Sequence, residues 1–290
     1  MTRVGWIGLG AMGGPMAAVA SAEHELLVFD LAVGAVERLT DRGVAAASSI
    51  AAAASGVGIL AIMVATEAQV DAVLFGEGGA APELEPGATV VVMATVGPAA
   101  VERWEARLAE RGVALVDAPV SGGVARAGLG DLLIMVSGAP AAVAAVGPLL
   151  ATLARSAPVV GDRAGDGQRV KLVNQLLCGV HIAAAAEALA FAESLGLDPR
   201  ATWQTVRSGA AASFMLDDRG GRMLDAEFEP PLSAIDIFVK DMGLVQDAAA
   251  ASGLSTPVAG AARGLYARAA AAGLGRKDDS VLIDVIRSEK

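Results

Sequence analysis

The sequence is poor in cysteine, histidine and aromatic residues. Its single cysteine, Cys178, excludes an intrachain disulfide, and with only 2 histidines, His24 and His181, no cluster of thiolates and imidazoles is left to hold a metal ion. Aromatic residues make up 3% of the chain, yet the hydrophobic share reaches 54%. This composition excludes a disordered chain and predicts a large core of Ala, Val and Leu, with Cys178 as a small core residue.

Positive charge is also scarce. The 290 residues contain 22 Lys and Arg against 32 Asp and Glu, a net charge of −10, which disfavours nucleic acid as a partner. The uncharged segment Val44–Thr66 is long enough to cross a bilayer, but the turn residues Ser55 and Gly56 interrupt it. We expect a helix, a turn and a buried strand there. No signal-peptide pattern precedes the first expected strand, so the sequence predicts a soluble, cytoplasmic protein.

The first half of the chain alternates short apolar runs with longer helical patterns. This alternation predicts βαβ units and a parallel sheet, because parallel strands need crossover connections. The expected strands are Val4–Ile7, Glu25–Phe29, Ile59–Val64, Thr89–Met93 and Val113–Val116, with later edge strands at Leu132–Val136 and Pro158–Val160. The expected helices are Ala11–Ala22, Ala32–Arg42, Glu67–Phe75 and Ala99–Arg111.

After Asp162 the pattern becomes helical. A long helix is expected over Gln168–Leu195, since this segment lacks proline and is followed by Gly196 and Pro199. Further helices are expected over Arg200–Gly209, Ser233–Ser252 and Thr256–Gly273. The chain is therefore predicted to be an α/β protein, with a Rossmann-type doubly wound parallel sheet over residues 1–162. A long interdomain helix joins this sheet to an all-helical domain over residues 163–290.

A glycine pattern follows the first expected strand. Gly8, Gly10 and Gly13 form a GxGxxG turn that opens a helix, with Ala11 and Met12 between the last two glycines. In this setting the first glycine makes the turn, the second lets backbone N–H groups approach a pyrophosphate, and the third packs the helix on the strand. The turn therefore predicts a dinucleotide site.

Asp30 decides which dinucleotide is expected. It ends the second strand, 22 positions after Gly8 (30 − 8), where a carboxylate accepts hydrogen bonds from the adenine ribose hydroxyls. The same carboxylate repels the 2′-phosphate of NADP, and no Arg follows within Leu31–Val33 to receive it. The predicted cofactor is NAD. The alternative is a structural glycine turn in which Asp30 only caps the next helix.

Four motifs resemble the β-hydroxyacid dehydrogenases, a family that includes 3-hydroxyisobutyrate dehydrogenase, tartronate semialdehyde reductase and L-threonate dehydrogenase and is related to the 6-phosphogluconate dehydrogenases. They occur in the family's order and span almost the whole chain. The motifs are Gly8–Met16, Asp117–Gly123, Lys171–Gln175 and Ile237–Asp241. The resemblance implies an NAD-dependent oxidoreductase that interconverts a small hydroxy-carboxylate and its oxo acid.

In this family the loop matching Ser121, Gly122 and Gly123 binds the substrate carboxylate, which suits a hydroxyl followed by backbone N–H groups. Lys171 matches the catalytic lysine. Hydride loss from an alcohol carbon requires loss of the hydroxyl proton, and a lysine accepts it when burial and a neighbouring positive charge lower its pKa. Asn174 and Gln175 lie three and four residues further along the same helix face and are expected to bind substrate.

The resemblance assigns the remaining site residues. Lys240 is implied to contact both cofactor and substrate, with an ordinary surface lysine paired to an acid as the alternative. Val64, Ala65 and Thr95, which lie at the ends of expected strands or just after them, are implied to contact the cofactor. Ala65 and the residues near Thr95 depart from the usual family pattern. His181 lies two helical turns after Asn174 and is expected to be a packing residue, with contact to a polar substrate tail as the alternative.

The substrate is less constrained than the cofactor. Residues 179–188 and 275–280 are most similar to the L-threonate branch, which favours a polyhydroxylated acid over 3-hydroxyisobutyrate. A tartronate or succinic semialdehyde reductase remains the alternative, and Lys171 argues against an imine reductase because those relatives generally replace it. The resemblance also implies a homodimer or homotetramer.

Overall fold

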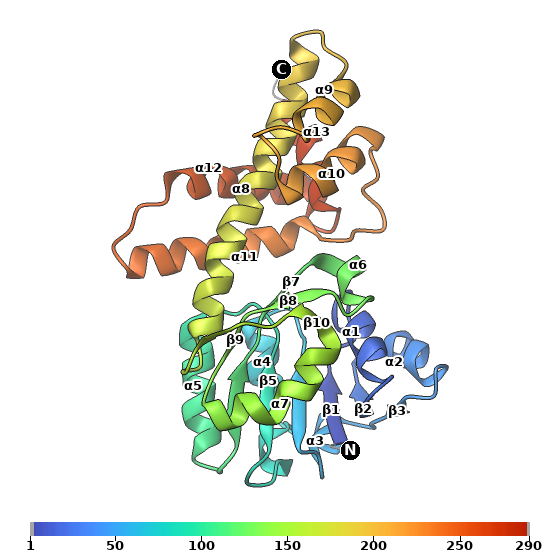
Figure 1. Cartoon of the computed structure of the whole chain (residues 1–290), viewed down its shortest axis with the longest axis vertical. Coiled ribbons are helices and arrows are strands. Elements are labelled where there is room, and N and C mark those ends of the chain that lie inside the picture. The colour runs from blue at the N-terminus through green and yellow to red at the C-terminus, as the bar shows by residue number, and fades with distance from the viewer. Residues whose placement is uncertain (1–2, 289–290) are drawn as a thin grey trace. The chain divides into compact units, whose positions relative to one another are not determined.

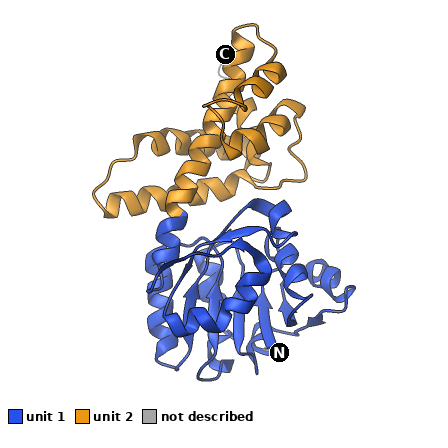
Figure 2. Cartoon of the chain, in the orientation of Figure 1, with its two compact units in different colours: residues 1–171 blue, residues 172–290 orange. Residues whose placement is uncertain are grey.

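The computed structural model describes residues 3–288 and contains two compact units. The units, coloured separately in Figure 2, divide between Lys171 and Leu172. This division falls inside the long helix α8 (Asp166–Ser194), whereas the sequence pattern placed the domain boundary before that helix. Each unit has its own hydrophobic core.

The predicted Rossmann-type sheet forms the centre of unit 1 and has eight strands, including β3, which the sequence pattern did not predict. Its strand order is β11-β9-β6-β5-β4-β1-β2-β3, and neighbouring strands are parallel except β6 and β9. The order of the first six strands, 3-2-1-4-5-6, is that of the Rossmann fold. The strands are β1 (Arg3–Ile7), β2 (Glu25–Phe29), β3 (Ala45–Ala46), β4 (Ile59–Ile62), β5 (Thr89–Val92), β6 (Ala114–Asp117), β9 (Val136–Ser137) and β11 (Val159–Gly161).

Helices cover both faces of this sheet (Figure 1). Side chains alternate between the faces along each strand, so Trp6 joins one core cluster and its neighbour Ile7 the other. The first cluster takes in α1 (Gly13–Ala20), α2 (Val33–Thr40) and α7 (Pro140–Leu153). The second takes in α3 (Ile50–Ala54), α4 (Glu67–Phe75), the 3₁₀ turn η1 (Ala81–Glu83) and α5 (Pro98–Ala109).

A second, three-stranded sheet lies in the last part of unit 1. Its order is β10-β8-β7, formed by β7 (Val120–Ser121), β8 (Leu132–Ile134) and β10 (Ala154–Ser156). Ser121 pairs with Leu133 in antiparallel register at the end of β7. The short helix α6 (Gly123–Ala127) follows at once, so this sheet fixes the start of the Ser-Gly-Gly loop.

Unit 2 is helical, as predicted. Besides the later part of α8 it contains α9 (Pro199–Val206), α10 (Phe214–Asp225), α11 (Ile235–Ala251), α12 (Pro257–Ala269), α13 (Leu282–Arg287) and the short turns η2 (Ala270–Leu274) and η3 (Asp279–Val281). Phe238 stacks on Tyr266 with ring centroids 5.1 Å apart, and the Tyr266 hydroxyl donates to the Gly179 carbonyl at 2.9 Å. These contacts join α8, α11 and α12.

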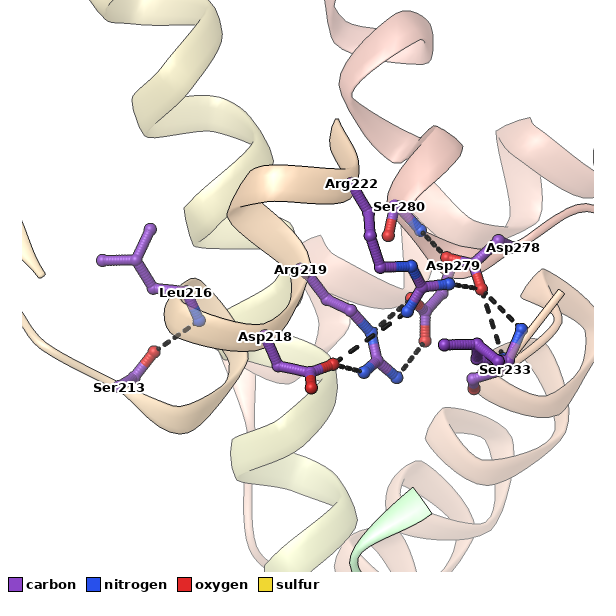
Figure 3. A network of polar contacts seen from close by, with 10 residues as sticks. Ser213, Leu216, Asp218, Arg219, Arg222, Ser233, Asp278, Asp279 and Ser280 are labelled. Carbon is purple, nitrogen blue, oxygen red and sulfur yellow. Dashed lines mark hydrogen bonds and ion pairs between the residues drawn. The ribbon is translucent and has the colours of Figure 1, made fainter. Parts of the chain in front are cut away.

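A buried ion pair links α10 to the segment after α12 (Figure 3). The Arg219 guanidinium donates to both oxygens of Asp279, at 2.8 and 3.0 Å, and also pairs with Asp218. Burial lowers the pKa of Arg219. The ion pairs with Asp279 and Asp218 together raise it by more than burial lowers it, so the pKa lies above its usual value. Asp279 is fully buried, so the bidentate pair with Arg219 offsets part of the cost of removing both groups from water.

The adjacent Asp278 fixes the start of α11. Its Oδ2 accepts from the backbone N–H groups of Leu232 and Ser233, at 2.9 and 3.3 Å, and pairs with Arg222 (Figure 3). Its Oδ1 accepts from the Ser280 N–H at 3.0 Å. The network thus holds together the loop that leads into α11, the helix of Lys240.

One described helix, α8, is long and apolar enough to cross a membrane. Its most apolar window has a mean hydropathy of 1.5, and 50% of that window is buried inside the protein. A core helix of a soluble protein has the same properties, so this is weak support for a membrane span.

Candidate active site

The glycine turn connects β1 to α1, and packing constrains two of its three glycines. Gly8 has φ of 98°, and a Cβ there would collide with the Met63 carbonyl. A Cβ at Gly13 would collide with the Gly8 carbonyl. Gly10 is exposed, and a Cβ there would meet open space. The two outer glycines are required by packing, whereas the middle one leaves the backbone open to an approaching pyrophosphate. The cradle therefore fits a dinucleotide.

Asp30 is bound to this turn. Its Oδ2 accepts from the Leu9 N–H at 2.6 Å, and its Oδ1 accepts from the Ala32 N–H at 2.8 Å, beside the start of α2. Asp30 does not cap α2, however, because the N-cap residue of that helix is Ala32 and no side chain caps it. Each carboxylate oxygen accepts more than one hydrogen bond, so the fixed carboxylate also has acceptor capacity for ribose hydroxyls.

The other expected cofactor residues follow the carboxyl ends of neighbouring strands. Val64 and Ala65 follow β4, and Thr95 follows β5. The Ala65 N–H donates to the Gln69 side chain at 2.8 Å, which fixes this loop to the first turn of α4. Since β1 and β4 are adjacent and the strand order reverses between them, these loops lie where open α/β sheets bind ligands.

The Ser121-Gly122-Gly123 loop has a backbone conformation that residues other than glycine rarely adopt. Gly122 and Gly123 have φ of 144° and 75°, so both lie in the region that favours glycine. Two such residues turn the chain sharply between β7 and α6. Successive N–H groups in turns of this kind form concave sites for anions.

Lys171 lies in the second turn of α8 and its side chain is only 6% exposed. A lysine is rarely this buried unless it has a partner or a function. Three residues earlier on the same helix face, Gln168 is fully buried and bonded to Asp117 and to the loop that contains Thr95. The sequence reading assigned no role to Gln168 or Asp117.

The polar residues of unit 2 form a chain of hydrogen bonds. Asn174 donates to Gln175 at 2.9 Å, and Gln175 donates to Asp241 Oδ2 at 2.5 Å. The Lys240 ammonium pairs with Asp241 Oδ1 at 2.6 Å. The structure thus brings together Asn174, Gln175 and Lys240 through Asp241, and it contains the acid partner that the surface-lysine alternative expects.

Asp241, Asp117 and Gln168 are the polar residues that sequence reasoning missed. Asp241 and Asp117 occur inside two of the quoted motifs, and Gln168 lies just before a third. A charged residue within an apolar strand or helix was the available signal, because such groups are seldom buried without partners. Burial raises the pKa of Asp117 to about 6, although hydrogen bonds from Gln168, Gly165 and Ser137 lower it.

His181 and Cys178 both lie in α8 and are partly buried. Cys178 packs against the hydrophobic core of unit 2, and its sulfur accepts a hydrogen bond from Asn174 at 3.3 Å. Among residues 3–288, no group of three or more His, Cys, Asp or Glu side chains is placed to hold a metal ion.

Two family models together match nearly the whole chain. The NAD-binding domain of 6-phosphogluconate dehydrogenase matches residues 3–161, and the NAD-binding domain of NADP-dependent 3-hydroxyisobutyrate dehydrogenase matches residues 165–286. L-threonate dehydrogenase of Cupriavidus necator is 40% identical over 98% of this chain and 95% of its own length. The chain belongs to the β-hydroxyacid dehydrogenase family. The family resemblance predicted from the four motifs is confirmed.

Two further β-hydroxyacid dehydrogenases extend the comparison. 2-Hydroxy-3-oxopropionate reductase of Escherichia coli K12 is 36% identical over 98% of this chain and 97% of its own length. The crystal structure of 3-hydroxyisobutyrate dehydrogenase from Salmonella typhimurium superposes with a TM-score of 0.92 at 38% identity, covering 98% of this chain and 100% of that one. The protein is an NAD-dependent oxidoreductase that acts on CH–OH groups of hydroxy acids, as predicted.

Proposed function

We propose that the protein oxidises L-threonate, or a closely related polyhydroxylated acid, with NAD and with Lys171 as general acid and base. The buried lysine on α8 carries the mechanistic part of this proposal. The substrate rests on similarity: L-threonate dehydrogenases from several bacteria are 37–40% identical to this chain over nearly its whole length.

Each residue of the proposed site has a role that follows from its chemistry. NAD, when bound, is the hydride acceptor. The Lys171 amine takes the proton of the hydroxyl that becomes a carbonyl, and in the reverse direction its ammonium returns that proton. Ser121 and the N–H groups of Gly122 and Gly123 hold the substrate carboxylate. Asn174, Gln175 and Lys240 bind the substrate's oxygen atoms, and Lys240 also contacts the cofactor.

The cofactor contacts follow from the loops at the sheet edge. The N–H groups of Gly10 to Gly13, with Ala11 and Met12, bind the pyrophosphate, and Asp30 binds the adenine ribose. Val64, Ala65 and Thr95 line the path toward the nicotinamide.

A semialdehyde reductase is the second candidate. The 36% identical relative is named 2-hydroxy-3-oxopropionate reductase, which is tartronate semialdehyde reductase. The same lysine serves this direction, because it protonates the carbonyl oxygen as hydride reaches the carbon.

A substrate panel tests the proposal. L-threonate, 3-hydroxyisobutyrate, glycerate, 4-hydroxybutyrate and L-serine are each supplied with NAD, and tartronate semialdehyde with NADH, while NADH absorbance is followed. We expect L-threonate to give the highest kcat/KM. A higher value for 3-hydroxyisobutyrate, or turnover of tartronate semialdehyde alone, contradicts the proposed substrate.

Asp30 should set the preference for NAD. We expect Asp30→Ser to lower the ratio of kcat/KM for NAD to that for NADP by about 10-fold or more, since a charged hydrogen bond contributes about 1.5–3 kcal/mol. Serine keeps an acceptor for the backbone N–H groups that Asp30 now binds. Asp41→Ser, on the exposed end of α2, is the matched control and should leave the ratio unchanged. A wild-type preference for NADP contradicts this role.

We also propose that residues 163–290 bind substrate and associate into a homodimer or homotetramer in the cytoplasm. Large apolar side chains lie exposed along one side of α8 at spacings of 4 and 14 residues. They include Val173, Leu177, Phe191 and Leu195. These side chains form an apolar stripe, and the exposed Ala184 and Ala188 lie between its two halves. The same helix of a second copy could pack against such a stripe. Light scattering measures the mass in solution, and a monomer contradicts the proposal.

A further inference from the structure

Asp117 lies at the carboxyl end of β6 and is fully buried. Its Oδ2 accepts from the N–H groups of Gly165 and Gln168, at 3.1 and 2.9 Å, and from the Ser137 hydroxyl at 3.3 Å. Its Oδ1 accepts from the side-chain amide of Gln168 at 2.7 Å. Four donors therefore fix both oxygens of this carboxylate at the start of α8.

The Gln168 side chain is also fully buried, and all of its hydrogen-bonding capacity is used. Its Oε1 accepts from the N–H groups of Val96 and Gly97, at 3.0 and 3.1 Å. Its Nε2 donates to the Ala94 carbonyl at 3.0 Å as well as to Asp117. Reversing the amide would set donor against donor and acceptor against acceptor at every one of these contacts, so Asp117 and the loop dictate its orientation.

These bonds connect two parts of the proposed catalytic machinery. The loop of residues 94–97 follows β5 and contains Thr95, and Gln168 lies one helical turn before Lys171 on the same face of α8. We propose that Gln168 and Asp117 are positioning residues that hold the Thr95 loop and the Lys171 turn in fixed register. The inference rests on the proposed roles of Lys171 and Thr95.

Stability alone is a poor reason for this arrangement. Moving a carboxylate from water into the protein interior costs desolvation free energy. Apolar side chains of similar size at such a position often give a protein that is equally stable or more stable. Burial raises the pKa of Asp117 to about 6, which shows this cost. Positioning supplies a reason, because a displacement of about 1 Å between reacting groups lowers rates about 100-fold.

Exchanging the acid and the amide gives a specific test. Gln168→Glu removes the amide donor and sets a second carboxylate against Asp117. Asp117→Asn keeps an acceptor for the three donors on Oδ2, so its NH₂ group must face the Gln168 NH₂ group. The double variant Asp117→Asn/Gln168→Glu restores a donor facing an acceptor and keeps the bonds to Val96 and Gly97. Only the contact with the Ala94 carbonyl stays mismatched.

The measurements are kcat, KM, the dissociation constant of NADH and the thermal midpoint of each variant. We expect each single variant to lower kcat about 100-fold. The loss of NADH affinity should be much smaller, because the glycine turn and Asp30, which hold the pyrophosphate and the adenine ribose, are unchanged. The kcat of the double variant should be at least about tenfold higher than that of either single variant, as expected for groups that interact directly. Gln246→Glu makes the same exchange in unit 2, at an amide bonded to Thr256, and should leave kcat unchanged.

Three results would overturn the inference. They are wild-type kcat in both single variants, a double variant no faster than the slower single variant, or losses of kcat that simply follow the loss of thermal midpoint. The proposed role of Lys171 fails separately. If Lys171→Met retains turnover while the exchange variants lose and regain it, the network positions the loop but Lys171 is not the base.

Discussion

Replacing Lys171 with methionine is expected to lower kcat with L-threonate and NAD by about 10²–10⁴-fold, the range that general acid–base catalysis contributes. Methionine has a similar length, favours helix and suits a buried position, so α8 should persist. The variant lacks the amine that accepts the substrate's hydroxyl proton. Turnover is followed by NADH absorbance and NADH binding by fluorescence.

Two comparisons make this result specific. NADH should bind the variant nearly as well as wild type, because the glycine turn and Asp30 belong to other loops. Lys277→Met removes an exposed lysine that pairs with Glu229, and it should leave kcat unchanged. If Lys171→Met turned over at the wild-type rate, a different group would have to accept the proton.

Removing the Asp279 carboxylate should strongly destabilise unit 2. We expect Asp279→Ala to lower the free energy of unfolding by about 3–5 kcal/mol, because it leaves the buried Arg219 charge without its bidentate partner. The loss should appear in urea unfolding followed by circular dichroism. NADH binding in unit 1 should change much less, since the pair lies within residues 172–290.

Two further variants distinguish the destabilisation caused by a buried unpaired charge from that caused by the loss of an ion pair alone. Asp225→Ala breaks the exposed pair with Arg200 and should cost at most about 1 kcal/mol. Arg219→Met/Asp279→Ala should be more stable than Asp279→Ala alone, because no charge is then left buried without its main partner. A loss for Asp279→Ala as small as that for Asp225→Ala contradicts the importance of the pair.

Much of unit 1 could be predicted because its signals are local. Each long strand of the main sheet is an apolar run between turn residues, and the glycine turn follows the first strand directly. Helix α7 was missed because Pro140–Leu153 contains no charged residue, so it shows no contrast between a buried and a solvated face. Helix α10 was missed for another reason: Gly220 and Gly221 argue against a helix, yet Gly220 is needed for close packing on Trp203.

The candidate site divides in the same way. Lys171 and the Ser121-Gly122-Gly123 loop stand out in the sequence because each belongs to a compact motif, and Asp30 stands out by its spacing from Gly8. Two of the three residues bonded to Asp117, Gly165 and Gln168, lie about 50 residues further along the chain. No periodicity or spacing rule joins such distant residues, so their hydrogen bonds emerge only once the sheet and α8 have formed.

The central proposal is that this site removes hydride from C2 or C3 of a hydroxy acid and passes it to NAD. The most direct measurement uses L-threonate carrying deuterium at C2 in one sample and at C3 in another, with mass spectrometry of the NADH formed. The account predicts that one of the two samples yields NADH with one deuterium and that Lys171→Met yields almost none. Turnover that gives unlabelled NADH from both samples, or no turnover of L-threonate by the wild-type enzyme, would contradict it.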